Sequence, residues 1–365
     1  MRIAILGTRG IPNNYGGFER FAEVLSVLLT QRGHSVFVSS FNSSKKAETF
    51  YCGVHVIPIA TPKWFLQNFR MLIYDYRSLK WASKNNFDVI LECGHTFSPF
   101  IFFFPKSIRK KIIVNPDGLE YYRKKWHFLA KTFLKISERI AVKYSGKVIC
   151  DNPVLANRIK EKHGVSAIYI PYGAFIPNYV LENSSSNIFS EIDKPYYLMI
   201  TRFTPENNLD LIFGAFSKMP DKKLVVVGSA YSDYGNRVVS KYSIYENIKF
   251  LGAIYDQEKL NLLRYNANAY IHGHSVGGTN PSLLEAMACG CIIIAHDNSF
   301  NKYVLNSRGE FFLTGDDLVK SIFNVENLSE SQRTILKNFN VERILKEFAW
   351  DSVVLQYENI FSEVE

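Results

Sequence analysis

The sequence predicts an α/β protein made of two doubly wound domains, each a parallel sheet covered by helices. Short apolar and β-branched runs alternate with longer segments of helical periodicity, and this alternation is typical of parallel sheets. The alternation occurs twice, on either side of a stretch that lacks periodicity. A chain of 365 residues also exceeds one ordinary hydrophobic core.

The first series forms the predicted N-terminal domain, residues 1–171. A strand over 2–7 leads through a glycine loop into a helical pattern over 18–29, which ends at Gly33 because glycine accepts the left-handed backbone found at helix ends. The further predicted strands cover residues 36–40, 54–59, 89–92, 112–115 and 168–171. Predicted helices at 65–84 and 126–144 lie between these strands.

Residues 172–194 lack periodicity and contain three consecutive serines, so they form the predicted linker. The second domain, residues 195–340, has predicted strands at 196–200, 224–228, 248–251, 269–272 and 292–295, and predicted helices at 210–217, 257–267 and 282–289. A last helix over about 341–363 makes residues 341–365 a segment expected to cross back to the first domain. Two such domains are expected to face each other across a cleft at the carboxyl ends of their strands.

Composition excludes several classes of protein. The five cysteines are scattered and odd in number, which argues against a disulfide framework and for a reducing compartment. The chain starts on an apolar strand with no signal-peptide pattern, so a cytoplasmic location is expected. The longest uncharged apolar run, 97–105, is about half the length that a membrane-spanning helix needs.

The formal net charge of +9 arises in one segment, because residues 106–147 contain twelve Lys or Arg and three acidic residues. In this segment basic residues recur every fourth position, at Lys131, Lys135, Arg139 and Lys143. Apolar residues occupy a neighbouring helical face, at Trp126, Leu129, Phe133, Ile136 and Ile140. The pattern predicts either a basic amphipathic helix at an anionic membrane surface, or a helix with an apolar face in the core and a solvated basic face. No nucleic-acid-binding motif accompanies the charge.

Residues 274–287 join a glycine-rich turn to the start of a helix. Gly277 and Gly278 allow close approach of the backbone, and Thr279 and Asn280 suit the N-cap position before Pro281. Unpaired N–H groups at such a helix start favour a diphosphate. The alternative is an ordinary capped helix.

Two side chains of the second domain complete the predicted donor site. Glu285 lies one helical turn past the cap, where its carboxylate is placed to accept hydroxyl groups of a sugar ring; the alternative is a surface glutamate. Arg202 follows a strand, so it emerges at the carboxyl edge of the sheet and offers a forked, permanent cation to a departing diphosphate. Alternatively, Arg202 caps a helix or pairs with Glu206.

The glycine loop at 7–19 lies where a dinucleotide fingerprint would lie, but its glycine spacing is wrong and no acidic residue ends the second strand. Gly16 and Gly17 at the helix start are still able to present bare amides to an anion or a sugar, with Arg9 as a nearby cation. The alternative is that these glycines serve a tight turn alone.

Residues 115–126 leave a first-domain strand at the same kind of edge. Asp117 and Glu120, beside an aromatic pair, suit the binding of hydroxyl groups and assistance of proton transfer. The alternative is a turn followed by a helix with an acidic first turn. His95 also follows a strand, where a lone histidine is more often structural, and no acidic residue has the partners expected of a metal site.

Three motifs in this order resemble those of the retaining family-4 glycosyltransferases, which have the GT-B fold, and most of all the bacterial rhamnosyltransferase-like subgroup. They are Gly-Thr-Arg-Gly-Ile-Pro-x-x-Tyr-Gly-Gly-Phe-Glu at 7–19, Asn-x-Asp-Gly-x-Glu at 115–120, and Gly-Gly-Thr-Asn-Pro-Ser-Leu-x-Glu-Ala at 277–286. The resemblance covers nearly the whole chain. It implies a nucleotide-diphosphate sugar donor held mainly by the second domain, an acceptor held mainly by the first, and no required metal or further cofactor.

The sequence departs from the broader family at two positions. Gly277 stands where the family has a first glutamate, eight residues before Glu285, and Asn208 stands where the family commonly has a lysine, six residues after Arg202. Both departures are usual in the rhamnosyltransferase-like subgroup. They imply that phosphate neutralisation depends on Arg202, the helix start near Pro281 and Arg9.

These features together predict a glycosyltransferase that moves a sugar, with rhamnose from dTDP-rhamnose as the first candidate, to a polyprenyl-diphosphate-linked saccharide in bacterial surface polysaccharide synthesis, such as O-antigen or capsule. The predicted catalytic residues are Asp117, Glu120 and Arg202. The predicted donor contacts are Gly16, Gly17, Arg202, Gly278, Thr279, Asn280 and Glu285. The predicted acceptor contacts are Arg9, Tyr15, His95 and Asp117. The alternatives are a nucleotide-sugar 2-epimerase of the same fold and a catalytically silent nucleotide-sugar-binding scaffold.

Overall fold

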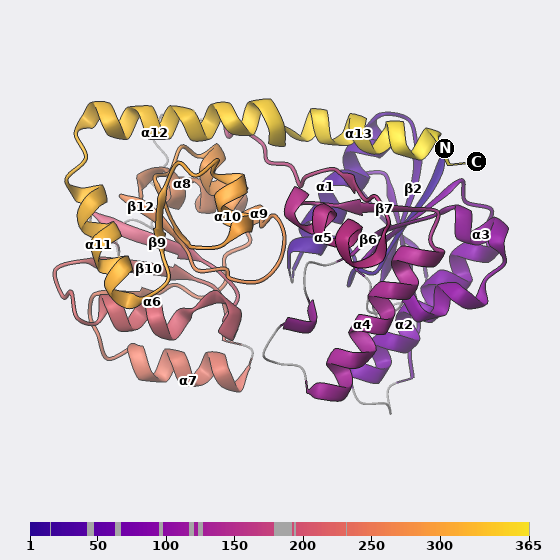
Figure 1. The fold of residues 1–365 in the computed structure, drawn as a ribbon, viewed down its shortest axis with the longest axis horizontal. Helices are drawn as coiled ribbons and strands as arrows, with labels where there is room; N and C mark the ends of the chain where they lie inside the picture. The colour runs from indigo at the N-terminus through magenta and orange to yellow at the C-terminus, as the bar shows by residue number, and fades with distance from the viewer. Residues whose placement is uncertain are drawn as a thin grey trace. The chain divides into compact units, whose positions relative to one another are not determined.

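The structure, a computed structural model, forms two compact units. Unit 1 comprises Met1–Tyr172 together with Trp350–Glu365, and unit 2 comprises Gly173–Ala349 (Figure 1). The structure describes residues 1–14, 16–41, 47–62, 67–94, 98–116, 120–122, 127–178, 192, 195–230 and 232–364. Each unit has its own sheet, so the α/β prediction with two parallel-sheet domains is confirmed.

Unit 1 contains an eight-stranded sheet in the order β3-β4-β2-β1-β5-β6-β7-β8. The strands are β1 (Arg2–Leu6), β2 (Ser35–Ser40), β3 (Thr49–Tyr51), β4 (Val54–Pro58), β5 (Val89–Cys93), β6 (Ile112–Asn115), β7 (Lys147–Cys150) and β8 (Ile168–Tyr169). All pairs are parallel except that of β3 with β4. The carboxyl ends of β1, β2, β5, β6 and β7 therefore share one edge, and the loops predicted to contact the acceptor leave from it.

Helices cover both faces of this sheet. They are α1 (Gly17–Gln31), α2 (Gln67–Lys84), α3 (Lys106–Lys110), α4 (Phe128–Tyr144), α5 (Pro153–His163) and α13 (Trp350–Ser362), with short 3₁₀ turns η1 (Ser98–Phe103) and η2 (Glu120–Tyr122). One core combines side chains of β1, β5 and β6 with Leu79 of α2 and Ala141 of α4. On the other side, α13 packs on α1 through Phe21, whose ring contacts Trp350 and Tyr357 (Figure 1).

Unit 2 contains a six-stranded parallel sheet in the order β11-β10-β9-β12-β13-β14. Its strands are β9 (Tyr196–Ile200), β10 (Lys223–Val227), β11 (Ile248–Phe250), β12 (Ala269–His272), β13 (Ile293–His296) and β14 (Glu310–Phe312). Its helices are α6 (Leu209–Phe216), α7 (Asp233–Tyr242), α8 (Gln257–Asn266), α9 (Pro281–Ala288), α10 (Ser299–Val304), α11 (Gly315–Glu326) and α12 (Glu330–Arg343). The strand order places β9 and β12 at the centre, with the 201–208 and 273–280 segments after them.

The end of the chain differs from the single helix predicted over about 341–363. Helix α12 ends at Arg343, a π-helical turn follows at Ile344–Phe348, and Ala349 takes an extended backbone with ψ 130° before α13 begins. The break lets Trp350 enter the core of unit 1, where it is 4% exposed. No helix in the described part of the chain is both long and apolar enough to span a bilayer.

Candidate functional site

The segment that follows β9 places Arg202 two residues beyond the end of the strand. Its carbonyl accepts hydrogen bonds from the Thr204 amide at 2.9 Å and from Asn207 Nδ2 at 2.7 Å, which fixes the turn. The Arg202 side chain is exposed. Within the ranges that the structure describes, it forms no ion pair, so the alternative of a pair with Glu206 is not what the structure has.

The start of α9 is attached to the end of the same strand. Ser282 Oγ donates to the Ile200 carbonyl at 3.3 Å, and Tyr270 Oη donates to the same oxygen at 3.0 Å. Because Ile200 is two residues from Arg202, the helix start and the arginine occupy one corner of unit 2. This corner unites two of the features from which the sequence predicts a diphosphate site.

The cap of α9 determines which amides remain for an anion. Asn280 is the N-cap, as the sequence predicts, and its Oδ1 accepts from the Ser282 amide at 3.0 Å. The Ser282 amide is therefore occupied, whereas the amides of Gly278 and Asn280 donate to none of the described residues. Gly277 has φ +131°, a backbone that side chains rarely adopt. Anion binding by this loop would thus involve amides before the helix more than amides inside it.

Asn208 has a structural role at the position where the resembled family commonly has a lysine. It adopts the left-handed backbone with φ 55° and caps α6. Its Nδ2 donates to the Gly273 carbonyl at 2.8 Å, which joins the turn after β9 to the loop after β12. Asparagine tolerates this backbone better than most residues do, so the departure from lysine has a local physical reason.

Two histidines, His272 at the end of β12 and His274 two residues later, have structural roles. Burial, with a smaller contribution from His296, lowers the pKa of His272 to about 3. His274 Nδ1 lies 2.9 Å from Asn207 Oδ1. His274 is thereby fixed to the turn that also carries Arg202.

Glu285 forms an ion pair with a buried residue, Arg264, for which the sequence predicted no role. Arg264 of α8 is 1% exposed, and its Nη2 forms an ion pair with Glu285 Oε2. Gln257 Nε2 lies 3.4 Å from the same oxygen. Burial is the largest single effect on the pKa of Arg264 and acts to lower it, but the Glu285 carboxylate and smaller contributions from Cys289, Tyr270 and Cys291 together outweigh it, so the net shift is upward. The carboxylate is thus oriented by a buried cation, with its side chain 19% exposed, and is not an ordinary surface glutamate.

In unit 1, the loop after β1 is clamped from two helices. Glu19 of α1 is buried, and its Oε1 accepts from the Arg9 amide at 2.9 Å. Tyr74 of α2 donates from Oη to the Thr8 carbonyl at 2.7 Å. Gly16 is the N-cap of α1 and Gly17 its first residue, as the predicted helix start requires. The sequence analysis assigned no role to Glu19 or Tyr74, although Glu19 ends the 7–19 motif.

A cavity of about 350 Å³ opens beside this loop. It is lined by Arg9, Gly10, Ile11, Pro12, Asn14, Ser40, Phe41, Ala47, Thr49, Val56 and Pro58. The lining comes from the ends of β1 and β2 and from the β3–β4 pair. The cavity gives Arg9, a predicted acceptor contact, a concave surface of small-molecule size.

The structure describes only part of the remaining residues that the sequence predicts for the site in unit 1. Tyr15, His95 and Asp117 lie outside the described residues, and the Glu120 backbone begins η2 while its side chain also lies outside them. Asn115, two residues before Asp117, is fully buried. Burial raises the pKa of the Tyr357 hydroxyl of α13, and a side-chain hydrogen bond with Asn115 opposes this shift, so a buried polar pair lies at the end of β6.

A buried carboxyl pair lies under the same edge. Asp75 of α2 and Glu92 of β5 are 2% and 3% exposed. Burial raises the pKa of Glu92 to about 8, and burial together with the neighbouring Glu92 raises the pKa of Asp75 well above its usual range. At neutral pH the pair therefore retains at least one proton.

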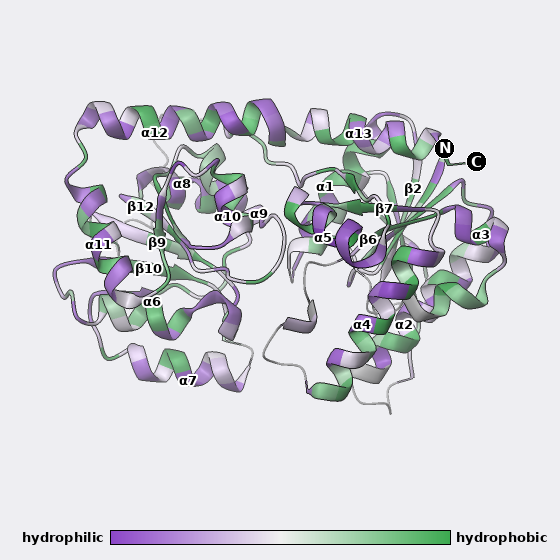
Figure 2. Cartoon of the chain, viewed as in Figure 1, coloured by the Kyte–Doolittle hydropathy of each residue, from purple (hydrophilic) through white to green (hydrophobic). Residues whose placement is uncertain are grey.

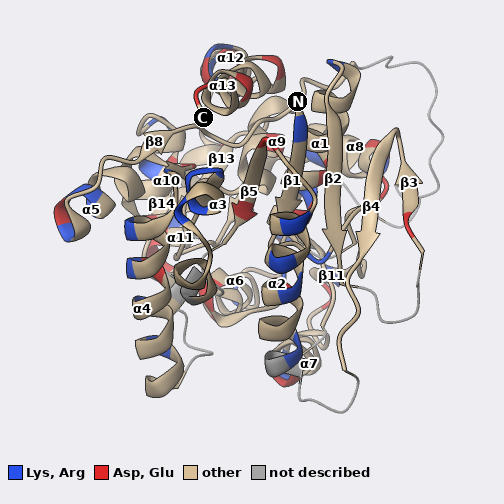
Figure 3. Cartoon of the chain, turned by 90° about the vertical axis from the view of Figure 1, so that its right-hand side faces the viewer, with Lys and Arg blue, Asp and Glu red and all other residues tan. Residues whose placement is uncertain are grey.

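Helix α4 buries a different face from the one its apolar residues predict. Leu134, Ser137, Glu138, Ala141 and Val142 face inward. Of the predicted apolar stripe, Leu129 is 80%, Ile136 51% and Phe133 37% exposed, Ile140 is partly buried, and Trp126 lies outside the described residues. Helix α4 does bury an apolar face, but that face consists of Leu134, Ala141 and Val142 and not of the predicted stripe. Figure 2 shows the apolar start of α4, and Figure 3 shows Lys and Arg recurring along it.

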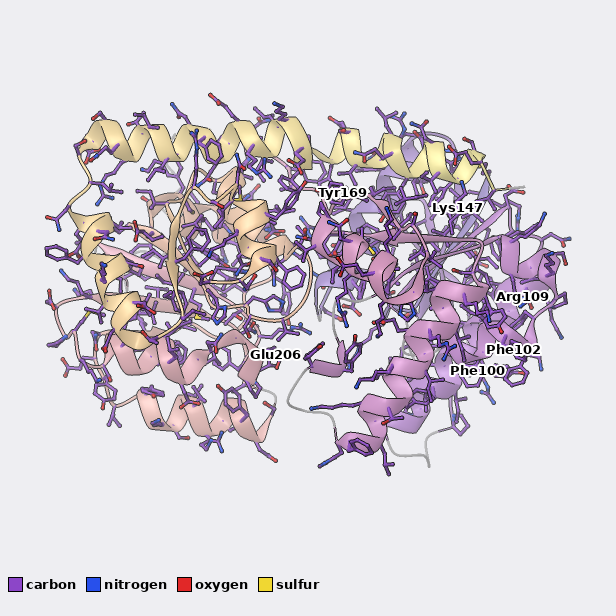
Figure 4. All side chains as sticks on the ribbon, viewed as in Figure 1. Phe100, Phe102, Arg109, Lys147, Tyr169 and Glu206 are labelled. Carbon is purple, nitrogen blue, oxygen red and sulfur yellow. The ribbon has the colours of Figure 1, made fainter. Side chains whose placement is uncertain are left out.

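Aromatic and basic residues continue this surface beside α4. Phe102 and Phe103 of η1 are 52% and 75% exposed. Phe102 packs edge-on against Tyr144 of α4, and the Arg109 guanidinium lies 5.4 Å from the centre of the same ring (Figure 4). We call Phe102, Phe103, Leu129, Lys131, Phe133, Lys135, Ile136, Arg139 and Lys143 the α4 surface.

The sequence matches two family models. Residues 1–175 match a domain of unknown function, DUF1972, and residues 182–349 match the glycosyl transferases group 1. No curated protein matches the sequence. The second match covers unit 2 with Arg202, α9 and Glu285, and it supports the prediction of a glycosyltransferase.

Solved structures share the fold over the whole chain. Sucrose-phosphate synthase from Thermosynechococcus elongatus superposes with a TM-score of 0.84 at 16% identity, covering 99% of this chain and 98% of its own. WaaG, a glycosyltransferase involved in lipopolysaccharide biosynthesis, gives 0.72 at 13% identity, covering 99% of this chain and 100% of its own. HepE of Anabaena, in complex with UDP, gives 0.73 at 15% identity with the same coverage. The chain is a glycosyltransferase, and its fold is GT-B.

Proposed function

We propose that this glycosyltransferase moves rhamnose from dTDP-rhamnose to a polyprenyl-diphosphate-linked saccharide at the cytoplasmic face of a bacterial membrane, with retention of configuration. The observation that carries the lipid-linked acceptor is the α4 surface, where exposed aromatic and aliphatic side chains alternate with cations. The structural relative WaaG is involved in lipopolysaccharide biosynthesis, which is in keeping with an acceptor of this kind.

The α4 surface has the composition of an interfacial helix. Such helices insert apolar side chains at the boundary between headgroups and acyl chains and keep Lys and Arg among anionic headgroups. Each basic residue near that surface contributes about 1 kcal/mol, and each large apolar side chain removed from water about 1.5–3 kcal/mol. The four cations Lys131, Lys135, Arg139 and Lys143 with three apolar neighbours suffice for reversible attachment.

The donor proposal depends on the corner of unit 2 that holds Arg202, the start of α9 and Glu285. In the reaction the bond from the sugar C1 to the diphosphate breaks, an acceptor hydroxyl oxygen bonds to C1, and the hydroxyl proton passes to an oxygen of the departing diphosphate. Arg202 and the amides of Gly278 and Asn280 meet the charge that grows on the departing diphosphate. Glu285, held by Arg264, accepts a hydroxyl of the nucleotide's ribose or deoxyribose. The UDP in the complex of HepE supports a nucleoside-diphosphate sugar as donor.

The acceptor side is assigned to unit 1. Arg9 lines the cavity after β1, and Gly16 and Gly17 start α1 beside it. In the proposal Tyr15 and His95 are further acceptor contacts, and Asp117 and Glu120 orient the acceptor hydroxyl or the sugar cation. No metal takes part, because Arg202 and the loop amides supply the charge that a metal would otherwise bring to the diphosphate.

Three measurements test this function. Transfer from dTDP-rhamnose is assayed with lipid-linked glucose, N-acetylglucosamine and galactose, and we expect turnover with one of them that EDTA leaves nearly unchanged. Calorimetry with dTDP, UDP and GDP gives the base. Tight binding of GDP without binding of dTDP would overturn the rhamnosyl donor, and conversion of the donor without any acceptor would indicate the 2-epimerase. No turnover at all, with intact nucleotide binding, would leave a binding scaffold.

A further inference from the structure

Three cations from two helices surround Tyr121, a buried tyrosine of η2 in unit 1. Tyr121 is 4% exposed; its Oη accepts from Arg158 Nη2 and, at 3.1 Å, from Lys162 Nζ. Its ring centre lies 5.3 Å from the Arg158 guanidinium and 5.6 Å from Lys135 Nζ. We call Tyr121, Lys135, Arg158 and Lys162 the Tyr121 cluster.

The cluster has more positive charge than the protein around it neutralises. Lys162 Nζ lies 2.6 Å from Glu138 Oε1, and the same oxygen is 2.9 Å from His163 Nε2. Neither Lys135 nor Arg158 has a carboxylate partner among the residues whose positions are described. A tyrosine hydroxyl is neutral at physiological pH and does not balance them.

Arg158 is the most informative member. It is only partly exposed, and burial lowers the pKa of its guanidinium, so the charge has been moved away from water without a described carboxylate to compensate it. Removing a cation of this kind from water costs free energy unless an anion pairs with it. Arginine also has the planar fork that matches phosphate oxygens.

We propose that the Tyr121 cluster binds the diphosphate of the lipid-linked acceptor, an inference that rests on the proposed function. Among the side chains that the structure describes at the cluster, three cations less the Glu138 carboxylate leave a charge of two, which suits a diphosphate diester. Because Tyr121 Oη accepts from two cations, its own proton remains to be donated to a phosphate oxygen, and those cations strengthen that donor.

The position of the cluster fits this ligand. Tyr121 follows β6 by six residues and so lies just past the Asp117 loop, which is predicted to contact the acceptor. Helix α4 packs against both η2 and α5, and Lys135 belongs to the α4 surface as well as to the cluster. A prenyl chain lying along the exposed Phe133 and Ile136 would bring its diphosphate to this place.

The test uses the full chain and farnesyl diphosphate as the probe, titrated by calorimetry without membranes. We expect Arg158→Gln to weaken its binding about tenfold or more, the usual effect of losing a hydrogen bond between charged groups. Lys160, which is exposed and lies two residues further along α5, provides the matched control, and Lys160→Gln should bind as the wild type does. Inorganic pyrophosphate should compete, and farnesol should not. The titrations are repeated on an Arg202→Ala background so that the donor corner does not contribute.

A second arm separates a lipid diphosphate from anionic headgroups in general. Binding to phosphatidylglycerol vesicles should be the same for Arg158→Gln and the wild type, since Arg158 is not part of the α4 surface. Equal loss of vesicle and farnesyl diphosphate binding would overturn a specific diphosphate site. If Arg158→Gln lowers the melting temperature, the titration is repeated with Lys135→Gln, on the exposed side of α4. For this variant we expect a several-fold loss of affinity for farnesyl diphosphate.

The inference and the proposed function fail in different ways. The titration measures binding and needs no turnover, so its result can be interpreted even if the protein transfers no rhamnose. Equal affinity of farnesyl diphosphate for the wild type and for both Arg158→Gln and Lys135→Gln would overturn the site, as would a wild type that does not bind the probe.

Discussion

At the scale of single residues, Arg202 is the cation expected to stabilise the departing diphosphate, and to do so most strongly in the transition state. Arg202→Ala should lower kcat roughly a hundredfold, since the loss of one preorganised donor typically costs on the order of 3 kcal/mol in the barrier. Steady-state kinetics and calorimetry of the nucleotide separate this from weaker binding. An unchanged turnover number would remove Arg202 from the reaction.

Glu285 and Arg264 should behave as one unit in which binding and stability are linked. Glu285→Gln leaves the fully buried Arg264 without its counter-charge, which typically costs about 3–5 kcal/mol of stability, and it also weakens nucleotide binding. In Arg264→Met/Glu285→Gln most of the stability should return while nucleotide affinity stays low. Urea unfolding and nucleotide titration of the wild type, Glu285→Gln, Arg264→Met and the double variant measure the cycle. A Glu285→Gln protein as stable as the wild type would show that the ion pair does not hold the carboxylate.

Arg264 also shows where residue-level prediction from sequence stops. Asn280, Pro281 and Glu285 could be predicted because capping and helical spacing are local properties. Arg264 lies 21 residues before Glu285, and an arginine in a helix is ordinarily assigned to the surface. Only the packing of α8 on α9 makes it buried, and no local signal contains that information.

At the scale of elements, α4 is expected to attach the protein to anionic membranes. Reversing Lys131, Lys135 and Lys143 to Glu should abolish binding to anionic liposomes, because each lysine near such a surface contributes about 1 kcal/mol. Wild-type binding should also weaken with salt, as the Debye length of about 8 Å at physiological ionic strength implies. Flotation assays with anionic and neutral liposomes measure both effects, and nucleotide affinity is the control. Equal flotation of the two proteins would leave α4 a solvated helix.

The buried pair of Asp75 on α2 and Glu92 on β5 predicts that unit 1 loses stability as pH rises. The folded chain holds the Glu92 proton up to a pKa of about 8, while the unfolded chain releases it near 4.5, so this contribution is complete below about 4.5 and disappears towards pH 8. Between pH 6.5 and 8 the loss should be about 1–2 kcal/mol, from 1.36 kcal/mol per proton and pH unit. His272, with its lowered pKa, acts only at lower pH.

Urea unfolding at both pH values measures this slope, with tryptophan fluorescence as the signal. All four tryptophans, Trp64, Trp81, Trp126 and Trp350, fall in the residue ranges of unit 1, so the signal reports that unit alone. Glu92→Gln removes one of the two titrating carboxyl groups and should make the dependence shallower, with Asp75 responsible for what remains. The same slope in wild type and variant would place the titrating group elsewhere.

Elements differ in how well the sequence predicted them, for physical reasons. The predictions for β6, β9 and β12 agree with the structure to the residue, because each is a compact apolar run in the middle of a sheet. Three strands were not predicted from the sequence: β3 and β14, whose three residues each are too few for a periodic signal, and β7, which starts on a lysine. On α4 the apolar stripe suggested the wrong inner face. Glu138 is buried there because Lys162 of α5 pairs with it and the His163 ring lies within hydrogen-bond distance of the same oxygen, which is a tertiary effect.

At the scale of the whole molecule, the last helix completes the first unit. Helix α13 follows unit 2 in the sequence, yet Trp350, Val353, Val354, Tyr357 and Phe361 are each at most 4% exposed within unit 1. Burial of such side chains contributes about 1.5–3 kcal/mol each, which together approaches the 5–15 kcal/mol that keeps a domain folded. Deletion of residues 350–365 should therefore unfold unit 1 and leave unit 2 folded, because unit 2 has its own sheet and core. Red-shifted tryptophan emission and a protease-resistant fragment near Gly173–Ala349 would report this, and deletion of residues 363–365 is the control. If the emission and melting of the longer deletion match the wild type, the dependence of unit 1 on α13 is refuted.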